Sequence, residues 1–363
     1  MIQKTNQLFF REQLLLWNRT ENDRDMPWKG EKDPYKIWLS EIILQQTRVD
    51  QGLAYYKRFI KKYPDVKSLA EAEDQAVFKM WEGLGYYSRC RNLLASARSI
   101  ASDSGGEFPD TYENILALKG VGAYTASAIA SFAFGLPHAV VDGNVQRVLA
   151  RFFGLEIPID STAGKKIFAE LAQQLLDKHD PAGYNQAIMD FGATVCKPQL
   201  PLCVSCILKE KCDALATGNV ASLPVKKKKL QKKDRWFYYV IAEYKTKIFV
   251  RERTGKDIWQ SLHEFILMEE EREMPVEQVV KKRLPSIFGS TAYSVESVSQ
   301  VYKQLLSHQT IRAVFIRVKL KALPVMPGYQ SLAGIETGKL AFPRVINTYL
   351  EDEQRGNVQL SVF

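Results

Sequence analysis

The spacing of hydrophobic residues divides the chain into a helical part and a strand-rich part. In the first part, apolar residues recur every three or four positions, which predicts helices that bury one or more faces. We expect these helices over Leu8–Trp17, Pro34–Gln51, Phe59–Tyr63, Ser68–Trp81, Val145–Phe153 and Tyr184–Val195. Residues 1–222 are therefore predicted to form an all-α domain.

From Arg235 onward, runs rich in β-branched and aromatic residues replace the helical spacing. Strands are predicted over residues 235–244, 247–253 and 310–320, with helices near Val276–Leu284 and Arg344–Leu350. This mixture predicts a separate α+β domain over residues 235–363. The segment Lys226–Lys233 is too polar to pack in a core, so residues 223–234 are expected to form a basic interdomain linker.

Composition and charge narrow the class of partner. The 363 residues are 46% hydrophobic, an ordinary fraction for a globular protein with two cores. Fifty Lys and Arg against 41 Asp and Glu give a formal net charge of +9, which favours a polyanionic partner. Charge alone does not separate nucleic acid from an acidic membrane surface. No apolar run approaches the length of a membrane span and the first residues do not form a secretory signal, so we expect a cytoplasmic protein.

A glycine hairpin lies in the stretch Leu118–Asn144. Gly120 and Gly122 permit a tight turn, and a small-residue helix follows to about Phe134. The free N–H groups of such a turn, at a helix N-terminus, can bind a phosphate of a nucleic acid. The alternative is a pair of helices whose glycines serve the turn alone, and these residues by themselves leave both interpretations open.

Two carboxylates stand at positions suited to acid and electrostatic catalysis. Glu41 lies within the apolar run of Pro34–Gln51, where burial would raise its pKa into the range of a general acid. Asp142 precedes the helix Val145–Phe153, whose N–H groups would keep it ionised, so that it could stabilise a positive charge. The alternatives are a glutamate on a solvated helix face and an aspartate that only caps a helix.

Four of the five cysteines are close together in the sequence. Cys196, Cys203, Cys206 and Cys212 are separated by six, two and five residues, and as thiolates they could bind one metal centre. The ligand type permits zinc or an iron–sulfur cluster, although the paired C-x-x-C knuckles usual for zinc ribbons are missing. Cys90, by contrast, is expected to be a small buried apolar residue.

Several of these motifs resemble one family. L-K-G-V-G-A-Y-T-A resembles the helix-hairpin-helix of the endonuclease III superfamily of DNA glycosylases, and V-D-G-N-V-Q-R-V resembles its segment with the catalytic aspartate. Within that superfamily the chain resembles the MutY family, which removes adenine mispaired with 8-oxoguanine. The resemblance implies a helix-hairpin-helix glycosylase domain with a [4Fe–4S] cluster on the four cysteines. It also implies a MutT-like (Nudix-like) C-terminal domain.

The resemblance assigns catalytic roles to residues of the helical domain. Glu41, in L-S-E-I-I-L-Q-Q-T, would protonate the adenine ring, and Asp142 would stabilise the positive charge on the deoxyribose. Asn144 would orient Asp142 or a water molecule. Bifunctional relatives have a Schiff-base lysine two residues after the second hairpin glycine, where this chain has Tyr124. A lyase reaction through an amine is therefore not expected, and Gln146 provides no amine either.

The resemblance also assigns contacts with DNA. Gln46 would be inserted near the vacated position in the base stack, and Arg24 and Trp28 of R-D-M-P-W would lie near the extruded base. Tyr86, in G-L-G-Y-Y-S-R-C-R, would intercalate, because an aromatic wedge must be exposed and rigid. As alternatives, residues 18–33 form a solvated loop with one anchoring Trp, and Tyr86 packs between helices.

In the C-terminal domain, Leu306-Ser307-His308 resembles the Phe-Ser-His loop that reads 8-oxoguanine. Leu306 replaces the Phe and weakens stacking, while Ser307 and His308 keep the hydrogen-bonding pair. The alternative is a turn capped by Ser307 beside a solvated His308. The acidic pyrophosphohydrolase signature is missing from the sequence, so this domain should bind without hydrolysing.

Together these features predict a monomeric, monofunctional adenine glycosylase that acts on double-stranded DNA with an 8-oxoguanine:adenine mismatch. Two alternatives remain from the sequence. One is an endonuclease III-like pyrimidine glycosylase and lyase, which Tyr124 and the second domain disfavour. The other is a non-catalytic iron–sulfur protein that binds DNA without releasing a base.

Overall fold

The computed structural model describes residues 4–227, 232–356 and 360–361, and the chain divides into two compact units. The first contains Met1–Glu71 and Asn92–Lys229, and the second contains Ala72–Arg91 and Leu230–Phe363. The predicted linker falls partly on residues 228–231, which lie outside the described residues. The predicted domain limits at residues 222 and 235 stay a prediction.

The first unit is helical, as predicted from its hydrophobic spacing. Its helices are α1 (Lys4–Thr20), α2 (Pro34–Leu44), α3 (Val49–Lys62), α4 (Val66–Ala70), most of α6 (Ser88–Asp103), α7 (Tyr112–Ala117), α8 (Ala123–Phe134), α9 (Gly143–Phe153), α10 (Thr162–Leu175), α11 (Pro181–Thr194) and α12 (Asp213–Ala216), with a 3₁₀ turn at Lys209–Lys211.

Two of the predicted helices are interrupted. The one expected over Pro34–Gln51 ends at Leu44, because Gln46 takes the left-handed conformation with φ of 55° before α3 begins. The one expected over Ser68–Trp81 is divided into α4 and α5 (Asp74–Trp81), and α5 belongs to the second unit.

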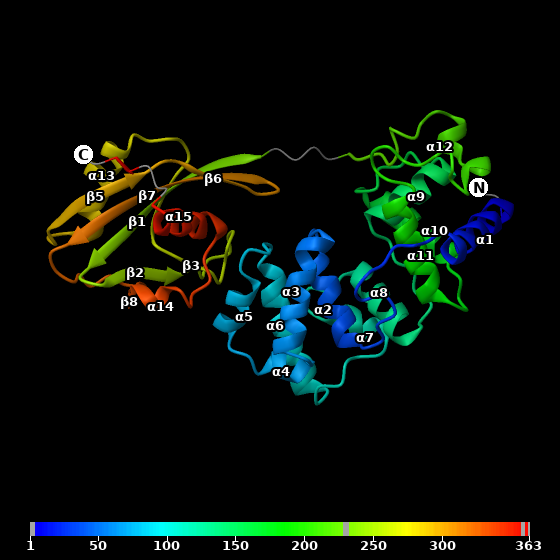
Figure 1. Cartoon of the computed structure of the whole chain (residues 1–363), viewed down its shortest axis with the longest axis horizontal. Helices are drawn as coiled ribbons and strands as arrows, with labels where there is room; N and C mark the ends of the chain where they lie inside the picture. Colours follow the sequence, from blue (N-terminus) through cyan, green and yellow to red (C-terminus); the bar gives the residue numbers. More distant parts are fainter. Residues whose placement is uncertain (1–3, 228–231, 357–359, 362–363) are drawn as a thin grey trace. The chain divides into compact units, whose positions relative to one another are not determined.

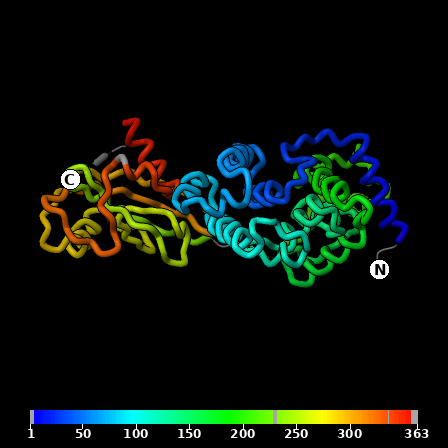
Figure 2. The backbone as a smooth tube through the Cα atoms, turned by 90° about the horizontal axis from the view of Figure 1, so that it is seen from below, coloured from blue at the N-terminus to red at the C-terminus, as the bar shows by residue number. Residues whose placement is uncertain are grey.

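The core of the first unit joins distant parts of the sequence. Figure 2 shows α1, in blue, beside the green helices that come much later in the chain, and α1 contacts both α10 and α11. Trp17 of α1 meets Phe191 of α11 edge-on, with ring centroids 5.1 Å apart. Phe10 of α1 packs against Phe152 of α9 at 4.9 Å. These aromatic contacts fix the helices that surround the candidate site.

The glycine hairpin connects α7 to α8, and Gly120 is required there for a steric reason. Its φ is 83°, and a Cβ at this position would lie 2.6 Å from Cβ of Asn92. Gly122 caps α8 with an ordinary φ of −102° and open space around it. The absence of a side chain at Gly122 leaves the N-terminus of α8 accessible, as an anion site requires.

The second unit is built on a mixed sheet. Its strands are β1 (Lys233–Tyr244), β2 (Lys247–Glu252), β3 (His263–Glu264), β4 (Ile266–Glu270), β5 (Tyr293–Ser299), β6 (Tyr302–Leu305), β7 (Gln309–Leu320), β8 (Gln330–Ala333) and β9 (Leu360–Ser361). The main path runs β3-β2-β1-β7-β5-β9, with β1 and β7 parallel from Lys233↔Gln309 to Glu243↔Lys319. This pairing with β7 includes Lys233, so β1 begins inside the predicted linker.

Helices cover both faces of this sheet (Figure 1). Trp236 and Tyr238 of β1 share a core with residues of α13 (Val276–Phe288). Tyr239, which points to the opposite face, stacks on Phe315, and Phe315 stacks on Tyr349 of α15 (Arg344–Gln354) with centroids 4.0 Å apart. Successive side chains of β1 therefore point alternately into two cores. For this reason the sequence of the strand is a continuous apolar run. A short helix, α14 (Gly334–Thr337), follows β8.

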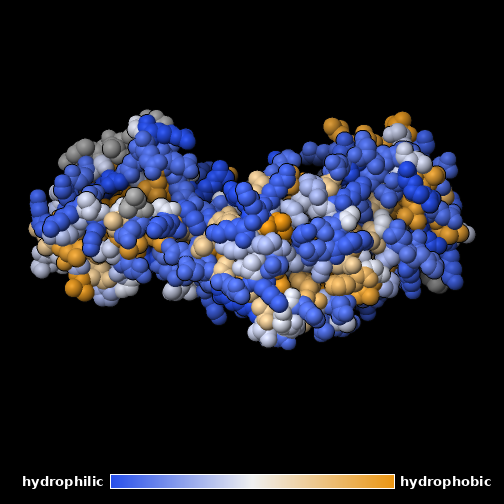
Figure 3. All heavy atoms as spheres, turned by 60° about the horizontal axis from the view of Figure 1, so that its bottom comes forward, coloured by the Kyte–Doolittle hydropathy of each residue, from blue (hydrophilic) through white to orange (hydrophobic). Residues whose placement is uncertain are grey.

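The surface agrees with the charged composition. The face shown in Figure 3 is mainly hydrophilic, with apolar residues in small groups. Among the residues that the structure describes, no helix combines the length and apolar character needed to cross a membrane.

Candidate active site

A cavity of about 700 Å³ lies within the helical unit. Its walls come from the loop after α1, from α2 and the turn that follows it, from the N-terminal end of α9, and from residues of α8 and α11. The predicted site residues that line it are Arg24, Trp28, Glu41, Gln46, Tyr124, Asp142 and Asn144. Segments separated by more than a hundred positions are thus brought to one cavity.

Glu41 is buried in the middle of α2. Side chains on every side of this helix from Tyr35 to Ile43 are buried, and Glu41 itself is only 8% exposed, which excludes a solvated helix face. Burial raises the pKa of Glu41 to about 7, opposed by a hydrogen bond with Tyr124 and assisted by the charge of Asp142. The predicted raised pKa is confirmed, and the carboxyl can hold a proton near neutral pH.

Asp142 caps the N-terminus of α9. Its carboxylate accepts the Val145 N–H at 2.7 Å and the Asn144 Nδ2 at 2.8 Å. Burial raises the pKa of Asp142 and outweighs these hydrogen bonds, which lower it. The expectation that capping would lower this pKa is wrong, because desolvation of the charged form is the larger effect. Asn144 lies where it can orient the carboxylate.

Tyr124 stands in the first turn of α8 and lines the same cavity as the two carboxyls. Burial and the charges of Glu41 and Asp142 raise the pKa of its phenol well above the ordinary value. Tyr124 therefore stays protonated and is a neutral hydrogen-bonding partner of Glu41. Its hydroxyl also lies 3.7 Å from Sδ of Met189.

Arg24 is held by a residue that the sequence analysis missed. Its Nη1 lies 2.7 Å from Oδ1 of Asp190, a fully buried side chain of α11. The same carboxylate accepts Asn22 at 3.0 Å and Gln186 at 2.9 Å. An acid inside the apolar run Tyr184–Val195 was the available signal, as it was for Glu41. Asp190 fastens the loop that forms one wall of the cavity.

The same loop also contributes an aromatic ring and two lysines to the lining of the cavity. Trp28 meets Tyr56 edge-on at 5.7 Å. Lys29 and Lys32 also line the cavity and were not selected from the sequence. Lys29 Nζ donates to the Arg24 carbonyl at 3.1 Å, and Lys32 Nζ to that of Phe132 at 3.0 Å. Both amines are therefore engaged with the protein.

The remaining predicted DNA-contact residues lie elsewhere. Gly120 and Gly122 form the hairpin before α8. Tyr86, in the second unit, is 42% exposed with a left-handed φ of 48°, which excludes packing between helices. Ser307 and His308 are exposed at the tip of the β6–β7 hairpin, with Oγ and Nδ1 3.1 Å apart.

The four clustered cysteines follow α11 in one loop. In the described part of the chain, no three or more His, Cys, Asp or Glu side chains are arranged to hold a metal ion. Burial raises the pKa of the Cys206 thiol to about 11, and the charges of the other three thiols raise it further. Arg151 Nη1 donates to Cys196 Sγ at 3.5 Å, and Arg147 Nε to the Cys196 carbonyl at 2.7 Å. All four cysteines are partly buried, and thiols are the ligand type of iron–sulfur clusters. Cys90 is fully buried, as predicted.

We predict that Glu41→Gln stabilises the protein, and more so as the pH rises. The pKa of Glu41 is about 7 in the folded state against 4.5 for an exposed Glu, so the folded state binds more protons and loses stability as the pH increases between these values. Gln does not ionise. Its advantage over Glu in the free energy of unfolding should grow by roughly 2 kcal/mol from pH 5 to pH 8.

Urea unfolding of both proteins across this pH range measures the effect. Glu107→Gln provides a matched control, since the same substitution is made there at an exposed position. An advantage of Glu41→Gln that does not depend on pH would contradict the burial argument.

Comparisons with known proteins agree with this geometry. The family described as "HhH-GPD superfamily base excision DNA repair protein" matches residues 39–176. A curated adenine DNA glycosylase of Buchnera aphidicola subsp. Baizongia pistaciae is 32% identical over 84% of this chain and 84% of its own length. The human adenine DNA glycosylase is 42% identical over 59% of this chain and 42% of its own.

Solved structures match the helical part. A thermostable thymine-DNA glycosylase is 31% identical and covers 59% of this chain and 98% of its own, with a TM-score of 0.55. A trapped endonuclease III–DNA covalent intermediate, at 20% identity, covers 60% of this chain and 99% of its own, with a TM-score of 0.53, and shows the fold alone. The chain therefore belongs to the adenine DNA glycosylase family and is a DNA glycosylase of the HhH-GPD superfamily.

Proposed function

We propose that the protein is a monofunctional glycosylase of base excision repair that hydrolyses the N-glycosidic bond of adenine mispaired with 8-oxoguanine or guanine. One observation carries this proposal: Glu41 and Asp142 line the same cavity, and the pKa of Glu41 is raised to about 7. A buried acid beside a second carboxyl is the arrangement needed to expel a purine. The names of the relatives supply the base that is released.

In the proposed reaction, adenine is flipped out of the duplex into the cavity. Glu41 donates its proton to a ring nitrogen of adenine, so that the electron pair of the breaking bond leaves with a neutral base. Tyr124 hydrogen-bonds to Glu41 and keeps the carboxyl oriented after it becomes charged. General acid catalysis of this kind contributes roughly 10²–10⁴-fold.

Asp142 stabilises the positive charge that develops on the deoxyribose. Its hydrogen bonds with the Val145 N–H and with Asn144 hold the carboxylate in one orientation. A cationic sugar in the cavity would favour the ionised form of Asp142 and so offset the raised pKa of the empty site. Water then adds to the sugar carbon and loses a proton, which leaves an abasic site.

The positions of the amines near the site support the monofunctional mode. Tyr124 occupies the position where the resemblance places a Schiff-base lysine in lyases. Lys29 and Lys32 line the cavity, but each donates to a main-chain carbonyl of the loop or of α8. Covalent attack on the sugar would require one of them to leave its partner and lose its proton.

DNA would be bound by the hairpin and by side chains at the cavity. Gly122 leaves the N-terminus of α8 open for a phosphate. Gln46 and Tyr86 are both non-glycine residues with left-handed φ, of 55° and 48°, a conformation that is often retained at functional sites. We propose that both enter the base stack, with Arg24 and Trp28 beside the flipped base.

The 8-oxoguanine would be read by Ser307 and His308. This base differs from guanine by an oxo group and by an N7 that donates a hydrogen bond, so a hydroxyl and an imidazole can distinguish the two. Both residues are exposed at a hairpin tip, where a duplex can reach them. We therefore propose double-stranded DNA with an 8-oxoguanine:adenine mismatch as the partner, and a monomer as the form of the protein that binds it.

We also propose that Cys196, Cys203, Cys206 and Cys212 bind a [4Fe–4S] cluster. The support is the thiol ligand set and the arginines that fasten this loop: Arg151 donates to the carbonyls of Lys197 at 2.7 Å and Pro198 at 3.2 Å. The cluster would act structurally, by ordering a loop that packs on α9.

The central test is base release from duplexes with adenine opposite 8-oxoguanine, guanine or thymine, and from one with thymine opposite guanine. We expect adenine release from the first two, and a loss of at least about 10²-fold in single-turnover rate for Glu41→Gln and for Asp142→Asn, with mismatch binding retained. Borohydride should trap no covalent adduct. Near-normal release by either variant would remove that residue from the mechanism, and release of thymine would reassign the substrate.

The second prediction concerns lesion reading. Ser307→Ala/His308→Ala should lose roughly tenfold or more of the binding preference for 8-oxoguanine:adenine over guanine:adenine, because the two hydrogen bonds are together worth about 1–3 kcal/mol. The rate of release from bound DNA should change less. An unchanged preference in a variant with a normal circular dichroism spectrum would mean that this hairpin does not read the lesion.

The third prediction concerns the cluster. Protein purified without oxygen should be yellow-brown with roughly four irons per chain. Cys203→Ser should lose colour and DNA binding together, since cluster binding and local folding share one free energy. Cys90→Ala is the matched control, because Cys90 lies outside the loop, and it should keep its iron. Zinc in place of iron in the purified protein would overturn the assignment.

A further inference from the structure

The loop Gly83–Arg89 holds an aromatic ring exposed and in a fixed conformation. Tyr86 is 42% exposed, and its left-handed φ of 48° is disfavoured for a residue with a side chain. The buried guanidinium of Arg89 lies 5.4 Å from the centroid of the Tyr86 ring. Such a conformation persists only where the surroundings enforce it. In a DNA glycosylase, an exposed and braced ring is suited to stack on or between bases.

Hydrogen bonds between side chains and its own backbone hold the loop in place. The Gly85 carbonyl accepts Nε1 of Trp81 at 3.1 Å and Nη2 of Arg89 at 3.1 Å. The Gly83 N–H donates to the Tyr87 hydroxyl at 3.2 Å. The loop can therefore move only as one body with the residues on either side of it.

Before the loop, the segment Leu340–Phe342 holds the end of α5 by hydrogen bonds. One carboxylate oxygen of Glu82 accepts the Phe342 N–H at 2.8 Å, and the other lies 2.8 Å from Lys79 Nζ. Lys79 Nζ also donates to the Leu340 carbonyl at 2.9 Å. Glu82 directly precedes the loop, so its carboxylate links the start of the loop to the segment Leu340–Phe342.

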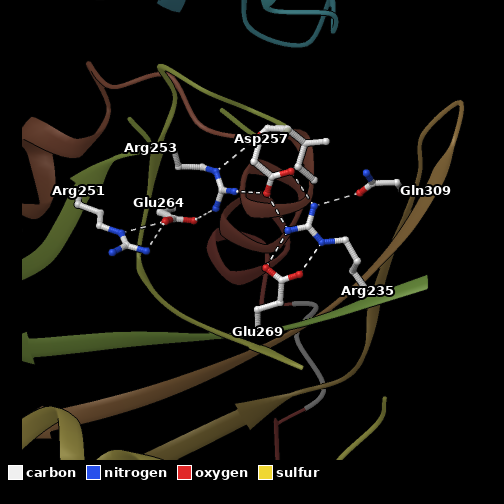
Figure 4. A network of polar contacts seen from close by, with 8 residues as sticks. Arg235, Arg251, Arg253, Asp257, Glu264, Glu269 and Gln309 are labelled. Atoms are coloured by element: carbon white, nitrogen blue, oxygen red, sulfur yellow. Dashed lines mark hydrogen bonds and ion pairs between the residues drawn. The ribbon is translucent and has the colours of Figure 1, made fainter. Parts of the chain in front are cut away.

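After the loop, Arg91 Nη1 donates to the Gln260 carbonyl at 2.6 Å. Gln260 belongs to a loop that is itself fixed by an ion-pair network (Figure 4). In that network Asp257 lies 2.7 Å from Arg235 and 3.0 Å from Arg253, and Arg253 also pairs with the buried Glu264. The second attachment of the Tyr86 loop is therefore rigid as well.

The segment after Phe342 also contacts the strand that leads to the β6–β7 hairpin. The Val345 N–H, in the first turn of α15, donates to Oε1 of Gln304 at 2.9 Å. Gln304 lies in β6, which ends just before Ser307 and His308. The Tyr86 loop and the exposed hairpin thus share one anchor, residues 340–345.

We propose that Glu82 is a positioning residue that sets the Tyr86 ring through its hydrogen bond with the Phe342 N–H. This bond and the one between the Val345 N–H and Gln304 hold the aromatic wedge and the lesion-reading hairpin at a constant spacing, so both contact one mismatch. The inference rests on the proposed function for the identity of the DNA lesion, while the positioning itself concerns only the stacking of Tyr86.

The test uses the full-length protein and a duplex with 2-aminopurine beside 8-oxoguanine opposite adenine, since the fluorescence of 2-aminopurine rises when a wedge unstacks it. Glu82→Ala should reduce the fluorescence rise on binding and slow single-turnover adenine release about fivefold, the factor for one hydrogen bond of about 1 kcal/mol. Glu82→Gln keeps an oxygen for the Phe342 N–H and should stay within about twofold of the parent, because the partly exposed ion pair with Lys79 contributes little.

Two further proteins separate positioning from general destabilisation. Tyr86→Ala should show the larger defect, and Glu82→Ala/Tyr86→Ala should be no worse than Tyr86→Ala, because Glu82 acts through that ring. Glu73→Ala is the matched control: this exposed glutamate starts α5 without a side-chain capping bond and should behave as the parent. If Glu82→Ala does not fold, Glu82→Asp, which retracts the acceptor, takes its place.

The outcomes are distinct. Additive defects in the double variant, or a Glu82→Gln defect as large as that of Glu82→Ala, would overturn the positioning role. Absence of adenine release from the parent protein would instead refute the proposed function. In that case the 2-aminopurine signal of the bound duplex still decides whether Glu82 positions Tyr86.

Discussion

The burial of Glu41 is the constraint on which the site depends. A carboxyl with 8% exposure, within a helix that is buried on nearly every side, takes up a proton near neutral pH because desolvation disfavours its charged form. The burial makes the carboxyl a proton donor near neutral pH, and it costs folding stability as the pH rises and the proton is lost. The helices around α2 offset this cost: α2 packs on both α3 and α8, and α8 presents Tyr124 to the carboxyl. The packing of α2 therefore both stabilises the helical unit and raises the pKa of Glu41.

A second buried acid, Asp190, holds neighbouring parts of the structure together. Asp190 is fully buried, yet it is surrounded by donors from Arg24, Asn22 and Gln186 and stays paired. Its function is to fasten the loop that closes one wall of the cavity. The contrast with Glu41 lies in the hydrogen-bond donors: the Asp190 carboxylate accepts from three side chains and holds the loop, whereas Glu41 has the Tyr124 phenol as its partner and burial raises its pKa.

The sequence predicted the helical unit well because its apolar spacing is strong, and it selected Glu41, Tyr124 and Asp142 from motifs that the structure places at one cavity. It failed where the outcome depended on tertiary contacts. The pKa of Asp142 follows burial, which no local pattern contains. The role of Asp190 could not be predicted, because the sequence does not show which loop would contact it. The short strands β3, β4, β6 and β8 were not predicted because they contain too few residues for a periodicity.

The second unit is discontinuous, since Ala72–Arg91 belongs with a sheet whose strands come much later in the chain. During synthesis, the helices of the first unit emerge and can pack before β1 exists. The Tyr86 loop, by contrast, is synthesised early but lacks Phe342 and Gln260 until the last part of the chain has folded. A chain that stops before β7 would contain every residue that lines the cavity but would lack Phe342, the partner of Glu82 at the start of the Tyr86 loop. The order of synthesis thus makes the support of the Tyr86 loop the last feature to be assembled, and in the role that we propose for Tyr86 the enzyme can stack on DNA bases only once its chain is complete.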